Sequence, residues 1–162
     1  MRIIGIDPGT GILGFGVIDT DKRGKRTLVD AGVIRTPAKE DDASRLQTIF
    51  EELCIVIADS KPAEMAVEKL FFAQNVTTAM TVAQARGVAI VAGTQAGLKV
   101  SEYTPLQIKQ ALTGYGRADK KQMQEMVRIL LGLKEVPQPD DCADALATAI
   151  CHANSASHRP AA

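Results

Sequence analysis

Acidic residues occur at three places in the chain where the neighbouring residues are apolar. Asp7 ends the segment RIIGID, and Glu68 lies near the end of AEMAVEKL. Asp140, Asp141 and Asp144 open the segment DDCADALATAI. Carboxylates that gather in apolar surroundings repel one another and are costly to remove from water, and a hard divalent cation such as Mg²⁺ relieves both costs. If the fold brings these acids together, they predict a metal site.

Two Mg²⁺ ions in such a site would indicate hydrolysis of a phosphate ester. Ions about 4 Å apart can hold a scissile phosphate between the attacking water and the leaving oxygen. Mn²⁺ is expected to be able to take the place of Mg²⁺. Each acid also has a simpler explanation, because Asp7 could be a turn residue and Glu68 a surface acid at a strand end. An Asp at the start of a helix is commonly an N-cap.

The expected sheet and helices decide whether the acids meet. Hydrophobic patterning predicts strands over 2–7, 12–19, 27–35, 63–70 and 98–104, and helices around 46–57, 75–97, 105–113, 119–132 and 140–153. In an open α/β sheet, sites lie at the carboxyl ends of the strands. Asp7 and Glu68 both reach that edge if the first and fourth strands are neighbours. The last helix could lay its first turn over the same edge.

The order of these elements predicts an α/β fold with a mixed five-stranded sheet flanked by helices. Short connections between the first three strands favour an antiparallel arrangement, and the later strands alternate with helices, which favours a parallel one. Thr104 before Pro105 is a good N-cap for a helix. Residues 1–153 are predicted to form a single domain, and residues 154–162 a disordered tail.

Glycines crowd the segment GIDPGTGILGFGV that surrounds Asp7. Pro8 favours an extended conformation for Asp7, which fixes the direction of its carboxylate. Gly14 and Gly16 are interpreted as leaving room beside the site for the backbone of a bulky ligand. The alternative is that these glycines only shape a tight hairpin.

Charge is balanced over the whole chain but not within it. The 19 Lys and Arg residues equal the 19 Asp and Glu residues, so net charge neither favours nor excludes a nucleic-acid partner. Residues 104–134 hold six basic residues and two acidic ones, which predicts a local surface for a phosphate backbone. A helix face that is merely solvated would show the same pattern.

The cysteines and the hydropathy indicate the compartment. Cys54, Cys142 and Cys151 form no CxxC pair and have no zinc-ligand spacing with a histidine, so they are predicted to be free thiols in a reducing cytoplasm. No apolar run reaches the length of a membrane span, and no membrane partner is expected.

Four segments together resemble the RuvC family of Holliday junction resolvases: GIDPGT, AVEKLFF, QARGVAIVAG and DDCADALATAI. They occur in order between Met1 and about His152. The resemblance implies a ribonuclease H-like fold, a homodimer, and Mg²⁺-dependent nicking of two opposed strands of a four-way DNA junction in recombination and repair. It also implies a partnership with the RuvA–RuvB branch-migration complex.

The resemblance also assigns roles to individual residues. It implies four acids that are both catalytic residues and metal ligands: Asp7, Glu68, Asp141 and Asp144. It places an aromatic residue near the junction centre and two lysines near the cleaved strand. Together with the basic segment it predicts a DNA-binding set: Phe71, Lys109, Arg117, Lys120 and Lys121.

The doubled aspartate needs a separate argument. Asp144 shares a helix face with a residue three or four positions before it, so spacing alone does not choose between Asp140 and Asp141. Pro139 makes Asp140 a natural N-cap, with its side chain turned back to the N–H groups of its own helix. The family pattern likewise indicates Asp141 as the catalytic residue.

Small residues recur in the helix expected over 75–97, at Ala79, Ala83, Gly87, Ala92 and Gly93. Such residues let another helix approach closely, which suits a dimer interface. Burial against the chain's own sheet explains the same pattern.

Three other functions remain open from the sequence. A ribonuclease acting on RNA–DNA hybrids would use similar acids. GIDPGT followed by GFGV also resembles the phosphate loop of sugar kinases and actin-like ATPases, although those enzymes close two such lobes over a nucleotide and this chain has room for one. A DNA-binding module without catalysis would need the basic segment but not the acids.

Overall fold

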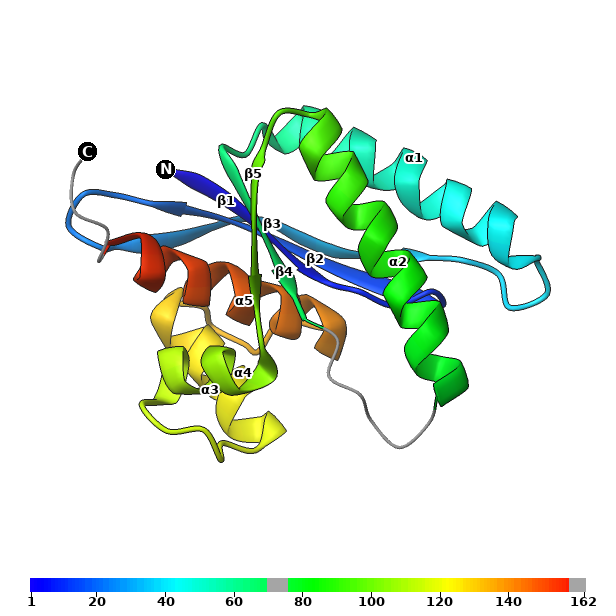
Figure 1. Ribbon diagram of the computed structural model, residues 1–162. Helices are drawn as coiled ribbons and strands as arrows, with labels where there is room; N and C mark the ends of the chain where they lie inside the picture. Colours follow the sequence, from blue (N-terminus) through cyan, green and yellow to red (C-terminus); the bar gives the residue numbers. More distant parts are fainter. Residues whose placement is uncertain (70–75, 158–162) are drawn as a thin grey trace.

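The computed structural model describes residues 1–69 and 76–157, and its strands form one mixed sheet (Figure 1). The strands are β1 (Arg2–Asp7), β2 (Ile12–Thr20), β3 (Arg26–Arg35), β4 (Glu64–Glu68) and β5 (Lys99–Tyr103). Their order across the sheet is β3-β2-β1-β4-β5. β1 and β3 are antiparallel to β2, whereas β4 is parallel to β1 and to β5. The predicted mixed sheet is therefore confirmed, and β1 and β4 are neighbours.

Helices cover both faces of the sheet (Figure 1). α1 (Asp42–Ser60) and α2 (Val76–Gln95) pack on one face. α5 (Asp140–Ser157) packs on the other face, and α3 (Pro105–Thr113) and α4 (Lys120–Leu130) pack against α5 on that side. Because both faces are covered, β1 reads as a continuous apolar run rather than an alternating one. Ile4 and Ile6 join the core under α1 and α2, and Ile3 joins the core under α5.

α5 lies against β1 and β2, and glycines make this close approach possible. A Cβ added to Gly5 would lie 2.1 Å from the Ala145 carbonyl oxygen, and one added to Gly14 would lie 2.2 Å from that of Asp141. A Cβ on Gly16 would lie 2.6 Å from the Leu146 side chain. The interpretation of Gly14 and Gly16 as room for a ligand was therefore wrong, because the space beside them holds α5.

A buried polar network fixes the C-terminal part of α5. His152, which is fully buried, lies with its Nδ1 2.8 Å from the Tyr103 hydroxyl and its Nε2 2.6 Å from Glu64 Oε2. These contacts join α5 to the end of β5 and to the start of β4. Since buried polar groups are costly to leave unpaired, the network holds α5 at a defined position over the sheet.

The helix ends confirm one expectation and correct another. Thr104 caps α3, with Pro105 at its first position. Residues 154–157, which were expected to belong to a disordered tail, are helical, because α5 continues to Ser157. Asn154 accepts a hydrogen bond from Arg26 and donates one of 2.9 Å to the Ala111 carbonyl, which keeps this turn helical. The rest of the expected tail, residues 158–162, lies outside the described residues.

The cysteines and the helices of the described residues bear on the expected free thiols and on the expected lack of a membrane span. Cys54, Cys142 and Cys151 are free thiols. Within residues 1–69 and 76–157, no helix is long and apolar enough to cross a bilayer.

Candidate active site

Asp7 and Glu68 lie at the same edge of the sheet and on the same face. Ile6 and Val67 are partners in the parallel pairing of β1 with β4, so the two acids follow at the same level. Side chains alternate along a strand, and Asp7 therefore shares the face of Ile3, which packs under α5. Glu68 shares the face of Ala66, which belongs to the same core. Both carboxylates thus end their strands on the side that α5 covers.

The first turns of α5 bring the other two acids to this edge. Gly14 is the antiparallel partner of Asp7, and a Cβ on Gly14 would lie 3.0 Å from the Cβ of Asp141. Asp141 is therefore beside the end of β1. Asp144, one turn further along α5, lines a cavity of about 180 Å³ together with Glu68. The structure thus brings together the four acids on which the sequence prediction rests.

Burial and neighbouring carboxylates destabilise the charged forms of Asp7, Glu68 and Asp144. Burial, followed by the charges of Glu68, Asp144 and Asp141, raises the pKa of Asp7 to about 8. Burial and the charge of Asp144 raise the pKa of Glu68 to about 7. Burial is also the main reason why the pKa of Asp144 is raised. A divalent cation bound among these carboxylates would favour their charged forms and would neutralise the charge.

The donor atoms fit a hard divalent cation, although they do not form a closed cage. Within the described residues, no group of three or more Asp, Glu, His or Cys side chains is arranged as a ready metal shell. Mg²⁺ does not require one, because it keeps several waters and binds through one or two carboxylates and the phosphate of its substrate. Oxygen donors from the sheet and from α5 at one edge suit this mode of binding.

Two of the predicted DNA-binding lysines face the carboxylates. Lys109 from α3 and Lys120 from α4 line the same cavity as Glu68 and Asp144. Lys120 Nζ lies 3.0 Å from Asp140 Oδ2 and 3.8 Å from Asp144 Oδ2. The hydrogen bond from Lys120 lowers the pKa of Asp140. Positive side chains at the rim of an acidic site can bind a phosphate that the acids alone would repel.

Asp140 does not cap α5, which corrects the expectation from the sequence. The helix includes Asp140 as its first residue, and the side chain points to α4 instead of to its own N–H groups. Asp140 Oδ1 accepts a hydrogen bond of 2.9 Å from Gln124 Nε2, and Oδ2 pairs with Lys120. Both partners come from α4, where they are four positions apart and share a face. The sequence reasoning missed Gln124, and this spacing is the only signal that could have identified it.

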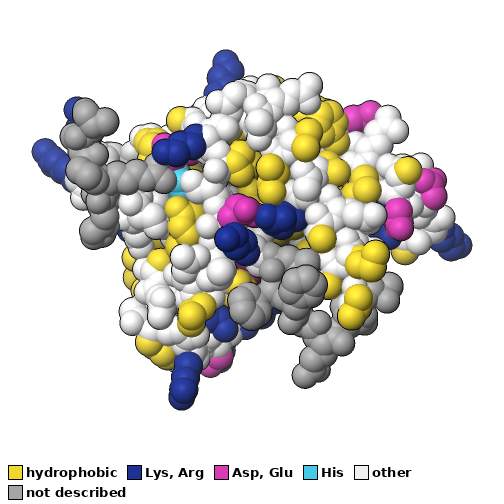
Figure 2. Space-filling model, in the orientation of Figure 1, with side chains coloured by type: hydrophobic (Ala, Val, Ile, Leu, Met, Phe, Trp, Pro, Cys, Tyr) yellow, Lys and Arg dark blue, Asp and Glu magenta, His cyan; other side chains and the backbone are white. Residues whose placement is uncertain are grey.

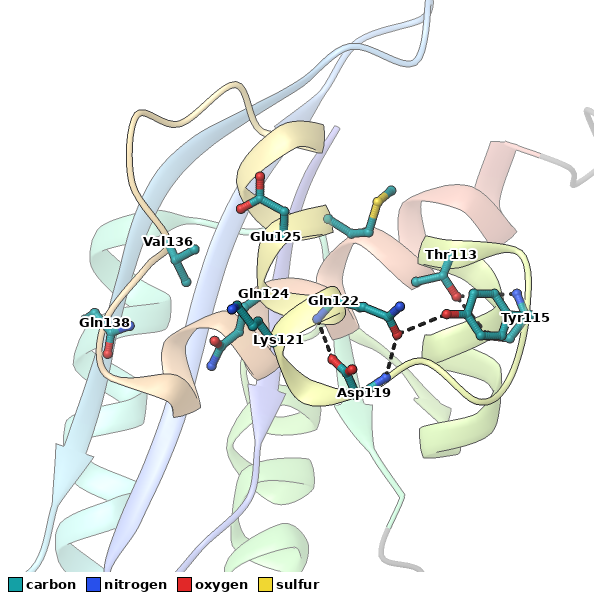
Figure 3. A pocket seen from close by; sticks show the side chains of 10 residues that line it. Thr113, Tyr115, Asp119, Lys121, Gln122, Gln124, Glu125, Val136 and Gln138 are labelled. Carbon is teal, nitrogen blue, oxygen red and sulfur yellow. Dashed lines mark hydrogen bonds between the residues drawn. The ribbon is translucent and has the colours of Figure 1, made fainter.

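The other predicted DNA-binding residues either do not line the cavity of Glu68 and Asp144 or lie outside the described part. Lys121 lines a second cavity, of about 730 Å³, on the outer side of α4 (Figure 3). Tyr115 borders this cavity and donates a hydrogen bond to Gln122 (Figure 3). Arg117 is exposed between α3 and α4. Phe71 lies outside the described residues.

The raised pKa of Asp7 predicts that the protein without metal loses stability as the pH rises. Its pKa is about 8 in the folded protein, compared with 3.8 for an unperturbed Asp, so folding favours the protonated form. This contribution is fully present below about pH 4 and is lost as the pH rises through about 8.

Asp7→Asn, which cannot ionise, should therefore stabilise the metal-free protein at pH 9 by on the order of 2 kcal/mol. At pH 5 the gain should be much smaller. Urea unfolding in EDTA at the two pH values measures the difference. The same gain at both pH values would contradict the raised pKa, and Asp59→Asn, an exposed acid on α1, is the control.

Comparison with known proteins places these features in a family. A family model described as Crossover junction endodeoxyribonuclease RuvC matches residues 3–152. A protein of that description from Heliobacterium modesticaldum is 58% identical over 156 residues, which are 96% of this chain and 95% of the relative.

Two solved structures are similar over almost the same length. The Thermus thermophilus RuvC structure has a TM-score of 0.89 and 40% identity, with 96% of this chain and 95% of that chain covered. The structure of T. thermophilus RuvC in complex with a Holliday junction substrate has a TM-score of 0.88 and 38% identity, with the same coverage of 96% and 95%.

Proposed function

Since the chain belongs to the RuvC family of crossover junction endodeoxyribonucleases, we propose that it resolves four-way Holliday junctions by paired nicks in recombination and repair. The observation that supports this most is the gathering of four acids and two lysines at one edge of a ribonuclease H-like sheet. Four acids are suited to metal-assisted phosphodiester hydrolysis, and lysines at their rim are suited to a nucleic-acid substrate.

Two features of the fold hold the four acids in place. Asp7 and Glu68 are fixed by the pairing of β1 with β4, and Asp141 and Asp144 by the packing of α5 on the glycines of β1 and β2. We propose that these four residues bind Mg²⁺, two ions to a site, with Mn²⁺ as a substitute. When bound, the ions would activate a water and neutralise charge on the scissile phosphate.

The lysines would hold the cleaved strand against the acids. Lys109 and Lys120 reach the cavity from α3 and α4, opposite the sheet, so a phosphate between them and the carboxylates has positive charge on one side. Lys121 and Arg117 extend the basic surface along the first turn of α4 and the loop before it. Phosphate contacts of this kind give affinity and register rather than sequence choice.

A homodimer would place one site on each of two like strands, because a four-way junction and a dimer share a two-fold axis. α2 offers a surface for it. Val76, Met80 and Val91 are 69%, 63% and 56% exposed, and Ala83 and Gly87 lie between them on the same stripe. Figure 2 shows hydrophobic side chains along the course that α2 takes in Figure 1.

The rest of the small residues in α2 serve the chain's own core. Ala79 and Ala92 are buried, and a Cβ on Gly93 would lie 2.6 Å from Met65 Sδ. Among the described side chains of α2, the outward stripe is therefore the part that remains for contact with a second copy.

Met80→Glu should convert the dimer into a monomer at micromolar concentration, because a charge in the middle of an apolar helix contact is costly to bury. Sedimentation velocity measures the change. Ile129→Glu, which alters a similarly exposed apolar residue on α4, should leave the dimer intact. A wild-type protein that sediments as a monomer while cutting both strands together would contradict the proposal.

The partnership with RuvA–RuvB and a cytoplasmic location are proposed from the family alone. A complex of the three purified proteins on one junction tests the partnership, and its absence at physiological salt would contradict it. A fluorescent fusion protein tests the location.

A comparison of substrates tests the proposed function against its alternatives. The protein is incubated with a mobile four-way junction, a linear duplex of the same sequence and an RNA–DNA hybrid, with Mg²⁺ or with EDTA. Cleavage of the junction alone, and only with Mg²⁺, is expected. Preferred cleavage of the hybrid would favour a ribonuclease, and binding of the junction without cleavage would favour a DNA-binding module.

A further inference from the structure

Two side chains of α4 bind the two carboxylate oxygens of Asp140, a residue to which the proposed function gives no role. Gln124 donates to Asp140 Oδ1 at 2.9 Å, and Lys120 Nζ lies 3.0 Å from Asp140 Oδ2. Both oxygens of this carboxylate are therefore engaged by one face of α4. The arrangement fixes the end of a long lysine side chain that would otherwise sample many rotamers.

The lysine has a second acid within reach. Its Nζ lies 3.8 Å from Asp144 Oδ2, on the residue one turn after Asp140 on the same side of α5. Asp140 and Asp144 thus compete for one ammonium group, and Asp140 holds it at the shorter distance. An ammonium group in full contact with Asp144 would occupy oxygen lone pairs that a metal ion needs.

We propose that Asp140 is a positioning residue that holds the Lys120 ammonium away from Asp144 and so keeps Asp144 open for a divalent cation. Gln124 supports this role by fixing the other oxygen of Asp140. The inference rests on the proposed function, since it takes Asp144 as a metal ligand.

The proposal makes a prediction about metal binding in the absence of DNA. In Asp140→Ala the ammonium group loses its nearer partner and turns to Asp144, where it competes with the metal. The concentration of Mn²⁺ at half-saturation should rise by about 1.5- to fivefold, the range expected when an exposed ion pair is exchanged. Titration of the DNA-free protein at pH 8.5, with free Mn²⁺ followed by electron paramagnetic resonance, measures it.

A double-mutant cycle separates positioning from simple loss of negative charge. Removing Asp140 lowers the negative potential of the site whether or not Lys120 is present, whereas the turning of the ammonium requires Lys120. Asp140→Ala should therefore shift the Mn²⁺ midpoint much less in a Lys120→Met background than in the wild type. Gln124→Leu should shift it in the same direction as Asp140→Ala, by a smaller factor. Asp59→Ala, which removes an exposed acid on α1, is the control for charge.

A second measurement uses cleavage. At saturating Mg²⁺ the Asp140→Ala protein should cut a junction at a rate within about twofold of wild type, while its Mg²⁺ midpoint rises as the Mn²⁺ midpoint does. A lower rate at saturation with an unchanged midpoint would overturn the positioning role.

Equal shifts of the Mn²⁺ midpoint with and without Lys120 would also overturn the proposal, because the effect would then be one of charge alone. A wild-type protein that binds no Mn²⁺ would overturn it too, since the free protein would have no site to keep open. That result would leave junction cleavage untouched. Failure of the proposed function would instead appear as an intact junction at every metal concentration.

Discussion

Asp7→Asn is expected to lower the rate of junction cleavage by at least about a thousandfold, since the metal ions of such sites carry most of the catalysis. The same result is expected for Glu68→Gln. Both substitutions keep the shape of the side chain and remove a charge that lies at the end of β1 or β4. Junction affinity should stay the same or rise, because removing a negative charge beside a phosphate does not weaken its binding.

Single-turnover cleavage with Mg²⁺ and filter binding with Ca²⁺ measure the two properties separately. Asp59→Asn, an exposed acid on α1, should match the wild type in both. Cleavage at the wild-type rate by either variant would contradict the metal assignment. Loss of junction binding together with cleavage would instead indicate that the acids support the fold or the DNA surface.

The second large effect concerns the first turns of α5. Asp141→Asn and Asp144→Asn should each remove nearly all cleavage, again about a thousandfold, because both lie at the edge where Asp7 and Glu68 end their strands. Asp140→Asn should retain close to the wild-type rate when Mg²⁺ is saturating. Asp140 faces α4 and not the end of β1. The cleavage rate of Asp140→Asn should therefore be far higher than the rates of Asp141→Asn and Asp144→Asn.

The measurement is the maximal cleavage rate of each variant across a Mg²⁺ titration, with thermal melting as a check on folding. If Asp140→Asn is folded but inactive at every Mg²⁺ concentration while Asp141→Asn cuts normally, the assignment is wrong by one residue.

Much of the fold was predictable because it depends on local pattern. The apolar run that ends at Asp7 and the alternation before Glu68 predicted the two strands, and short connections predicted the antiparallel start, which the structure confirms. The family was predictable for a different reason, because its motifs extend over almost the whole chain, and the family match over residues 3–152 confirms it.

What could not be predicted depends on contacts between distant elements. The glycines at 14 and 16 have a purpose only once α5 is known to lie on β2, and nothing near them in the sequence indicates a helix that starts at residue 140. The direction of the Asp140 side chain was unpredictable in the same way. Pro139 favours a cap, but two partners on α4 outweigh one hydrogen bond within α5.

The site was predictable in its residue types but not in its state of charge. Clustered acids suggested a cation, yet the pKa of about 8 for Asp7 depends on burial under α5 and on three other acids. None of these conditions can be read from the residues next to Asp7. We propose that the fold assembles a metal-dependent site that cuts opposed strands of a junction.

The most direct test is cleavage of a supercoiled plasmid that extrudes a cruciform. A single nick releases the supercoiling and the cruciform is reabsorbed, so linear DNA forms only when both opposed strands are cut during one binding event. With Mg²⁺ the wild-type protein should yield linear plasmid cut at the cruciform base, and with EDTA it should yield none. Nicked circles as the sole product, or equal cutting of a plasmid without the cruciform, would contradict paired cleavage of a junction by this protein.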